Sequence, residues 1–220
     1  MKLTDYLNAL AANNNRPWFQ AHRAVYDALR ERWYADLDRL FAACSAWEPA
    51  AARLDGRSAS YRIYRDTRFS PDKTPYKTYF SARMETLRLA GHVPGWYIQA
   101  GTSREWTGLY GGIWAPDSAQ LRKLRRAIVD NIEEFEDIIN APELTRLYPD
   151  WIGPRLKTIP KGWPKDHPQR ELLRLTEYGR EHTLPPEFFE DPAWPERAAE
   201  LMRPLKPLVD FLSYSLTEEV

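Results

Sequence analysis

The sequence has few of the features that mark secreted or membrane proteins. Among its 220 residues there is one cysteine, Cys44, so no intrachain disulfide can form, which fits a reducing cytoplasm. No stretch approaches the ~20 apolar residues that a membrane helix needs. The first residues reach charged and polar side chains before any apolar run. We therefore expect a cytoplasmic protein with no secretory signal and no membrane association.

The chain also has no net charge, because 31 Lys and Arg residues balance 31 Asp and Glu residues. Proteins that bind nucleic acids or membrane surfaces usually carry an overall basic excess. The balance therefore weighs against a nucleic-acid binder, although it leaves room for a local basic patch.

Familiar catalytic and cofactor motifs are missing as well. His22, His92, His167 and His182 lie far apart, and none has a His or Cys neighbour at zinc-ligand spacing. There is no P-loop, no dinucleotide fingerprint and no nucleophile elbow. We therefore expect no metal and no cofactor, assign no catalytic residue, and leave open whether the protein is an enzyme.

The N-terminal part of the sequence shows helical periodicity. Thr4-Asp5 is typical of a cap for a short first helix, and Asn15 followed by Pro17 favours the start of a second. Apolar and aromatic side chains then recur at helical spacing over residues 18–41. This pattern predicts one long amphipathic helix that ends near Cys44, with Cys44 as a small buried side chain.

Between residues 60 and 112 the repeat changes to two residues, which is typical of strands. Residues 61–69 and 76–84 alternate in this way on either side of a proline-containing turn. Residues 96–100 and 106–110 predict a third and a fourth strand. The short connections favour an antiparallel sheet.

The C-terminal half predicts more helices and an ordered loop. Pro116 is expected to open a helix whose solvent-facing sides carry the basic residues Arg122, Lys123, Arg125 and Arg126. Residues 132–139 extend it or form a separate helix. Residues 149–168 are too rich in proline for a helix and too rich in Trp and aliphatic residues for a disordered linker. A strand at 176–183 and a final helix follow.

We find no internal repeat in the chain and no stretch with the composition of a domain linker. The simplest interpretation is therefore a single α+β domain over residues 1–220. Its central antiparallel sheet, built from about residues 60–112, would be packed by the long N-terminal helix and by C-terminal helices.

The most distinctive stretch is residues 62–77, which concentrates five cations and two carboxylates. Arginine forks beside a carboxylate on a rigid turn can hold a phosphate, a carboxylate or one another. Strand alternation would place Arg65 on an apolar face with Ile63 and Phe69, so we expect Arg65 to be mostly buried and paired. Asp66, with its arginine neighbours, is better interpreted as an orienter of arginines than as a general base.

A second basic group lies on the proline-rich loop, at Lys157, Lys161 and Lys165 with His167. Alone it is ordinary surface charge. We expect it to matter if the loop folds over the first cluster, because prolines reduce the entropy lost when a loop closes on a ligand.

Five stretches together carry a family resemblance: residues 13–19, 62–77, 94–97, 111–116 and 156–168. In these stretches the chain resembles an uncharacterised family, domain of unknown function 2461. The resemblance spans nearly the whole length, and the second stretch is long enough to be specific. It implies that the stretches form one unit, and it implies no activity, cofactor or catalytic residue.

The main functional hypothesis is a module that binds a small phosphate- or carboxylate-bearing ligand, with or without catalysis. The candidate ligand-binding residues are Arg62, Arg65, Asp66, Arg68, Lys73, Tyr76, Lys77, Lys161, Lys165 and His167. One alternative is single-stranded nucleic-acid binding, with bases stacked on aromatic rings. The other is a structural or partner-binding protein whose arginine cluster is an internal ion-pair network.

Overall fold

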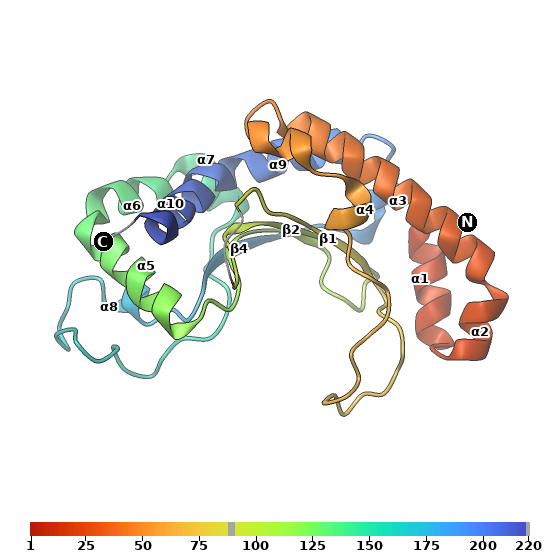
Figure 1. The fold of residues 1–220 in the computed structure, drawn as a ribbon, viewed down its shortest axis with the longest axis horizontal. Coiled ribbons are helices and arrows are strands. Elements are labelled where there is room, and N and C mark those ends of the chain that lie inside the picture. The colour runs from red at the N-terminus through yellow and green to blue at the C-terminus, as the bar shows by residue number, and fades with distance from the viewer. Residues whose placement is uncertain (88–90, 219–220) are drawn as a thin grey trace. The chain divides into compact units, whose positions relative to one another are not determined.

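Helices flank a four-stranded antiparallel sheet, as predicted for an α+β chain (Figure 1). The computed structural model describes residues 1–87 and 91–218. The strands lie side by side in chain order and are β1 (Phe80–Met84), β2 (Gly95–Ala100), β3 (Gly108–Ile113) and β4 (Tyr178–Thr183). The α+β class and the antiparallel sheet are confirmed.

Contacts along the chain divide it into two compact units. The first comprises Met1–Met84, Tyr97–Leu109 and Thr183–Arg203. The second comprises Glu85–Trp96, Tyr110–His182 and Pro204–Val220. In the described ranges, no helix is long and apolar enough to cross a membrane. That the whole chain acts as one domain stays a prediction.

The helices of the first unit are α1 (Leu3–Ala12), α2 (Arg16–Ala21), α3 (Arg23–Cys44), η1 (Pro49–Arg53), α4 (Gly56–Ala59), η2 (Pro186–Glu190) and α9 (Trp194–Met202). Asn15 caps α2 as predicted, because its side chain accepts from the Trp18 N–H at 3.0 Å. Two predictions need correction. The long helix is broken at His22, and Thr4 lies inside α1, where its hydroxyl and N–H both donate to Glu190.

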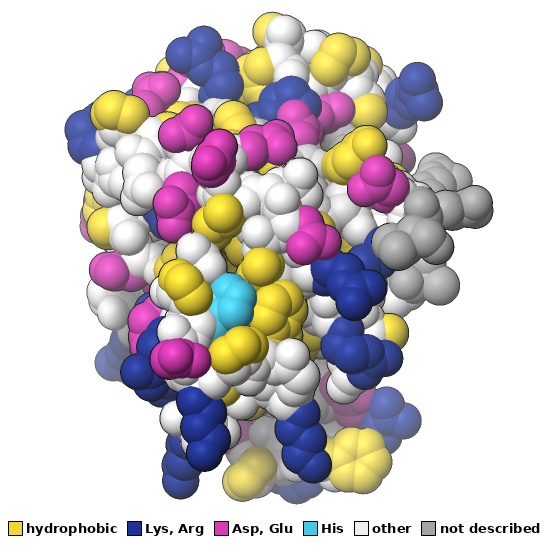
Figure 2. Space-filling model, turned by 90° about the vertical axis from the view of Figure 1, so that its left-hand side faces the viewer, with side chains coloured by type: hydrophobic (Ala, Val, Ile, Leu, Met, Phe, Trp, Pro, Cys, Tyr) yellow, Lys and Arg dark blue, Asp and Glu magenta, His cyan; other side chains and the backbone are white. Residues whose placement is uncertain are grey.

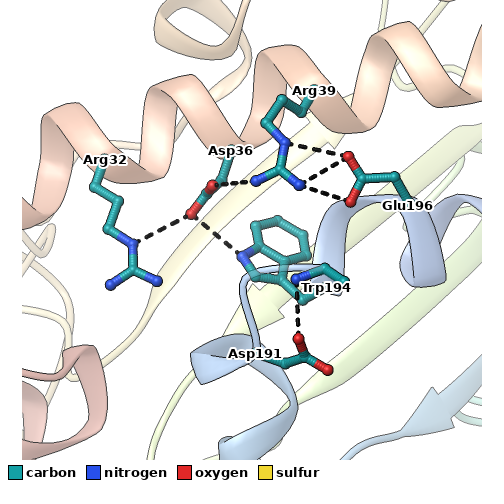
Figure 3. A network of polar contacts seen from close by, with 7 residues as sticks. Arg32, Asp36, Arg39, Asp191, Trp194 and Glu196 are labelled. Atoms are coloured by element: carbon teal, nitrogen blue, oxygen red, sulfur yellow. Dashed lines mark hydrogen bonds and ion pairs between the residues drawn. The ribbon is translucent and has the colours of Figure 1, made fainter.

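The aromatic stripe of α3 is core, packed against α9. The indole rings of Trp33 and Trp194 stack with centroids 5.4 Å apart, and both residues are buried. Figure 3 shows the polar contacts at this helix pair. Asp36 on α3 accepts from the Trp194 indole N–H at 3.3 Å, and Arg39 forms an ion pair with Glu196 at 2.8 Å. Cys44 at the end of α3 is buried, as predicted.

The helices of the second unit are α5 (Ser118–Asp130), α6 (Ile132–Ile139), α7 (Pro142–Leu147), α8 (Arg170–Leu173) and α10 (Lys206–Thr217), with η3 (Arg203–Leu205) leading into the last. Pro116 does not open α5. Asp117 caps it instead, in a capping box with Gln120. Arg125 was expected on a wet side of this helix, yet it is buried.

The core of the second unit joins β3 and β4 to α5, α6 and α10. Its buried members are Ile113, Leu124, Ile128, Phe135, Ile139, Leu175, Tyr178, Leu208, Phe211 and Leu212. Outside this core, α6 exposes carboxylates at Glu133, Glu134, Glu136 and Asp137. On the face in Figure 2, acidic side chains gather in the upper half of the view, while Lys and Arg side chains lie both at its top and along its lower part.

The strand predictions hold best where the residues are buried. β2 and β4 form within the predicted strands at 96–100 and 176–183, and β3 lies later than predicted, over Gly108–Ile113. Of the predicted strand at 76–84, only Phe80–Met84 forms. Residues 61–69 form no regular strand. Among them only Tyr64 forms a bridge, with Tyr76, and Ser60 just before them forms another, with Ala82.

Candidate functional site

The cationic stretch forms a long hairpin-like loop in the first unit. Two backbone hydrogen bonds close its base, from the Arg65 N–H to the Pro75 carbonyl at 3.0 Å and from the Lys77 N–H to the Ile63 carbonyl at 2.7 Å. Together with the Tyr64–Tyr76 bridge, these bonds fix the two ends of the loop against each other.

Asn14 anchors the returning arm of this loop. Its amide nitrogen donates to the Tyr76 carbonyl at 2.9 Å, and its Oδ1 accepts from the Tyr76 N–H at 3.1 Å. The Asn14 side chain thus makes the two hydrogen bonds that the backbone of a neighbouring strand would make to Tyr76. The buried Tyr76 ring also stacks on Phe19, with centroids 4.1 Å apart. Tyr76 is therefore held from both its backbone and its ring.

Arg65 is paired, as predicted, but within its own loop. Its guanidinium donates to the Asp72 carboxylate and to the Thr74 hydroxyl, and holds the pKa of Asp72 down to about 2. The Arg65 side chain is 28% exposed and that of Asp72 57% exposed, so this is no deeply buried ion pair. The predicted apolar face is wrong as well. Ile63 is buried, whereas Phe69 is 94% exposed, because the loop does not alternate like a strand.

Two further cations of the loop are engaged by the loop itself. Arg68 donates to the Asp66 carboxylate at 2.7 and 3.0 Å, and these bonds lower the pKa of Asp66 to about 2. Lys73 donates to the Thr67 carbonyl at 2.8 Å. Asp66 thus orients an arginine, which was its expected role.

A pocket of about 530 Å³ lies beside this loop, within the first unit. Its walls come from the end of α1, from the loop and its returning arm, and from the turn after β2. They are lined by Ala11, Asn14, Arg65, Asp66, Asp72, Thr74, Tyr76, Lys77, Thr78, Tyr79, Thr102, Arg104 and Glu105. The structure thus brings four predicted residues, Arg65, Asp66, Tyr76 and Lys77, into one lining.

The carboxylates of this pocket have hydrogen-bond partners, whereas two of its cations form no ion pair among the described residues. Asp66 and Asp72 each accept from an arginine, and Glu105 accepts from the Thr78 hydroxyl at 2.5 Å. Within residues 1–87 and 91–218, no carboxylate forms an ion pair with Lys77 or Arg104. Arg62, exposed and outside the lining, forms no ion pair in these ranges, although its charge contributes to lowering the pKa of Asp66. The pocket can therefore supply positive charge to an anion.

The other predicted residues lie elsewhere. Arg68 and Lys73 belong to the loop but not to the described lining. Lys161 and Lys165 are exposed residues of the second unit. His167, also in that unit, packs edge-on against Trp163, with ring centroids 5.1 Å apart, and its Nδ1 accepts from the Gln169 N–H. That these three residues close over the pocket stays a prediction.

Sequence reasoning missed several lining residues. Thr78 and Tyr79 directly follow residues 62–77, so their position next to this stretch could have identified them as lining residues. Asn14 falls within the family stretch at residues 13–19, but no pattern in the sequence assigns it to the site. Arg104 and Glu105 are single charges in a short turn, and no sequence pattern marks them. In the described parts of the chain, no group of three or more His, Cys, Asp or Glu side chains is arranged to hold a metal ion.

The fold and this pocket describe an α+β protein with a polar pocket beside its sheet. The chain belongs to the family described as "Conserved hypothetical protein (DUF2461)", whose match covers residues 2–211. The resemblance noted from the five stretches is thereby confirmed. A search of curated proteins finds no match, and neither does a search of solved structures.

Proposed function

We propose that the pocket of the first unit binds a small ligand through a phosphate or carboxylate group. Lys77 and Arg104 are the anion-binding residues, and Arg62 adds positive potential nearby. The observation that carries this proposal is the asymmetry of the lining. Asp66 and Asp72 are paired with arginines, whereas Lys77 and Arg104 have no carboxylate partner in the described ranges. An anion offers these cations the charge-assisted hydrogen bonds that they otherwise lack.

The remaining lining suits the polar body of such a ligand. The hydroxyls of Thr78 and Thr102 and the phenol of Tyr79 line the same pocket. Hydroxyl groups both donate and accept, so they can bind hydroxyls or amides of a ligand. The loop that carries Lys77 is anchored by Asn14 and by the Arg65–Asp72 pair, so little ordering remains when a ligand binds.

The cytoplasm is the setting that we propose for this binding. The chain has one cysteine, and Cys44 is buried with its thiol pKa raised to about 12 by burial. A chain without disulfides suits a reducing compartment.

Titration calorimetry tests the proposed binding. We expect glycerol 3-phosphate or succinate to bind the wild-type protein, while uncharged glycerol does not. Lys77→Gln and Arg104→Gln should each weaken binding by roughly 10- to 100-fold, since each removes one charge-assisted hydrogen bond.

Arg53→Gln is the matched control, because Arg53 is an exposed cation of the same unit and does not line the pocket. It should bind like the wild type. Binding that survives both pocket substitutions, or no binding of either anion, would overturn the proposal.

A further inference from the structure

Lys77 has surroundings unlike those of an ordinary surface lysine. Its ammonium lies 5.2 Å from the ring centroid of Tyr61 and 5.7 Å from that of Tyr79. The side chain is half-buried and lines the pocket. The two rings hold the amine in place at the wall of the pocket.

The surroundings of Lys77 make its ammonium easier to deprotonate than that of an ordinary exposed lysine. Burial first, and repulsion from Arg62 second, lower the pKa of the Lys77 ammonium. Arg83 lies over the same Tyr61 ring, with its guanidinium carbon 5.9 Å from the ring centroid. Glu105, the carboxylate of the opposite turn, faces Tyr79 and accepts from the Thr78 hydroxyl. Burial raises the pKa of the Tyr79 phenol, which therefore stays neutral near pH 7.

Lys73, four residues earlier in the same loop, offers a contrast. It is exposed, and its ammonium donates to the Thr67 carbonyl. A neutral amine is a nucleophile and an ammonium is not, so lysines that form Schiff bases are typically desolvated or placed beside another cation. Lys77 is half-buried, its pKa is lowered by burial and by Arg62, and it lines a pocket of ligand size.

We propose that Lys77 is a nucleophile that forms an imine with the carbonyl group of a small anionic aldehyde or ketone. This inference rests on the proposed function and narrows its ligand class to carbonyl compounds that carry a carboxylate or phosphate. In this complex Arg104 keeps the anionic group, and Lys77, which as an ammonium shares in anion binding, loses its proton and presents its Nζ to the carbonyl carbon.

The step balances without any added oxidant or reductant. The Nζ lone pair forms a C–N bond to the carbonyl carbon, and the carbonyl oxygen takes up a proton to give a carbinolamine. The carbinolamine then loses its hydroxyl, together with a proton, as water, and the C=N bond forms. The Glu105 carboxylate and the Tyr79 phenol line the same pocket and can exchange protons during this dehydration.

Reductive trapping on the wild-type protein tests this inference. Glyoxylate, an aldehyde with a carboxylate, is added with cyanoborohydride, and the modified lysines are located by peptide mass mapping. We expect Lys77 to be labelled severalfold faster than Lys73 and to retain its labelling at lower pH. Glycolate, which has the same charge but no aldehyde group, should slow labelling at Lys77 and leave Lys73 unaffected.

Lys77→Arg keeps the positive charge and should abolish the preferred adduct while the other lysines label as before. The wild-type comparison of Lys77 with Lys73 remains informative even if this variant folds poorly. Labelling of Lys77 no faster than Lys73 overturns the inference. If glycolate binds but Lys77 stays unlabelled, the imine is wrong and the proposed function stands. If neither glyoxylate nor glycolate binds, the proposed function itself fails.

Discussion

The two units hold their arginines in different ways. In the second unit, Arg125 and Arg180 are buried, 7% and 4% exposed, and donate to the backbone carbonyls of Leu175 and Tyr148. In the first unit, Arg65 and Arg68 are paired with carboxylates of their own loop, near solvent. Burial of a cation is costly and must be offset by the surrounding structure, so we assign Arg125 and Arg180 a structural role. The ion pairs of Arg65 and Arg68 shape the loop, and they leave Lys77 beside the loop without a carboxylate partner among the described residues.

The largest effect should follow from shortening a buried arginine. Arg180 packs its guanidinium over the Trp151 ring at 4.5 Å, and Arg180→Ala would leave a cavity there and the Tyr148 carbonyl without this donor. We expect a loss of about 2–5 kcal/mol in unfolding free energy, measured by urea denaturation. Arg180→Met fills the space without burying a charge and should cost clearly less. Equal losses for both variants would mean that packing on Trp151 contributes little.

The next effect concerns the anchor of the loop. Asn14→Ala removes both hydrogen bonds to the Tyr76 backbone and should reduce the unfolding free energy by about 1–2 kcal/mol. It should also weaken ligand binding, because Tyr76 and Lys77 lose their support. Asn13→Ala is the matched control, since Asn13 bonds only within its own helix end. A melt of Asn14→Ala that coincides with the wild type would show that the bridge at Tyr64 suffices.

Arg65→Ala should have a smaller effect on stability than either of these changes. Its partner Asp72 is largely exposed, and exposed ion pairs contribute little. The substitution should instead loosen residues 66–74, which hydrogen exchange of their amides can detect. A loss as large as that of Arg180→Ala would indicate that the Arg65–Asp72 pair supports the core as the buried arginines of the second unit do.

The smallest effect is a dependence on pH that is confined to this loop. The pKa values of Asp66 and Asp72 are lowered to about 2, so each carboxylate stabilises the folded loop above its ordinary pKa of 3.8. This contribution is lost as the pH falls from about 4 through about 2. Amide exchange in the loop should rise over that range, and Asp72→Asn should remove the Asp72 part of the response. An unchanged profile in Asp72→Asn would contradict the assignment.

The sequence predicted buried elements better than exposed ones. The alternation at residues 96–100 is enforced by burial of Trp96 and Ile98, and β2 forms there. Residues 61–69 show the same alternation, but Phe69 finds no core to pack against, so the pattern does not produce a strand. Periodicity alone cannot distinguish these cases, because tertiary contacts decide them.

The candidate site was predictable only in part for a similar reason. Lys77, Arg65 and Tyr76 lie in one conspicuous stretch, so their proximity follows from the sequence. Asn14, Arg104 and Glu105 reach the pocket through pairing of distant segments, which no local pattern reports. Which cations lack a carboxylate partner is likewise a property of side-chain geometry, and the sequence shows only that many cations are present.

The central claim is that Lys77 and Arg104 give the first unit an anion site. An amide NMR titration with glycerol 3-phosphate, with glycerol as the uncharged reference, tests it most directly. We predict saturable shifts confined to residues 74–79 and 102–105, with Asn14 also affected, and none with glycerol. Shifts that scatter over exposed lysines of both units, or no shift at residues 74–79, would contradict the account.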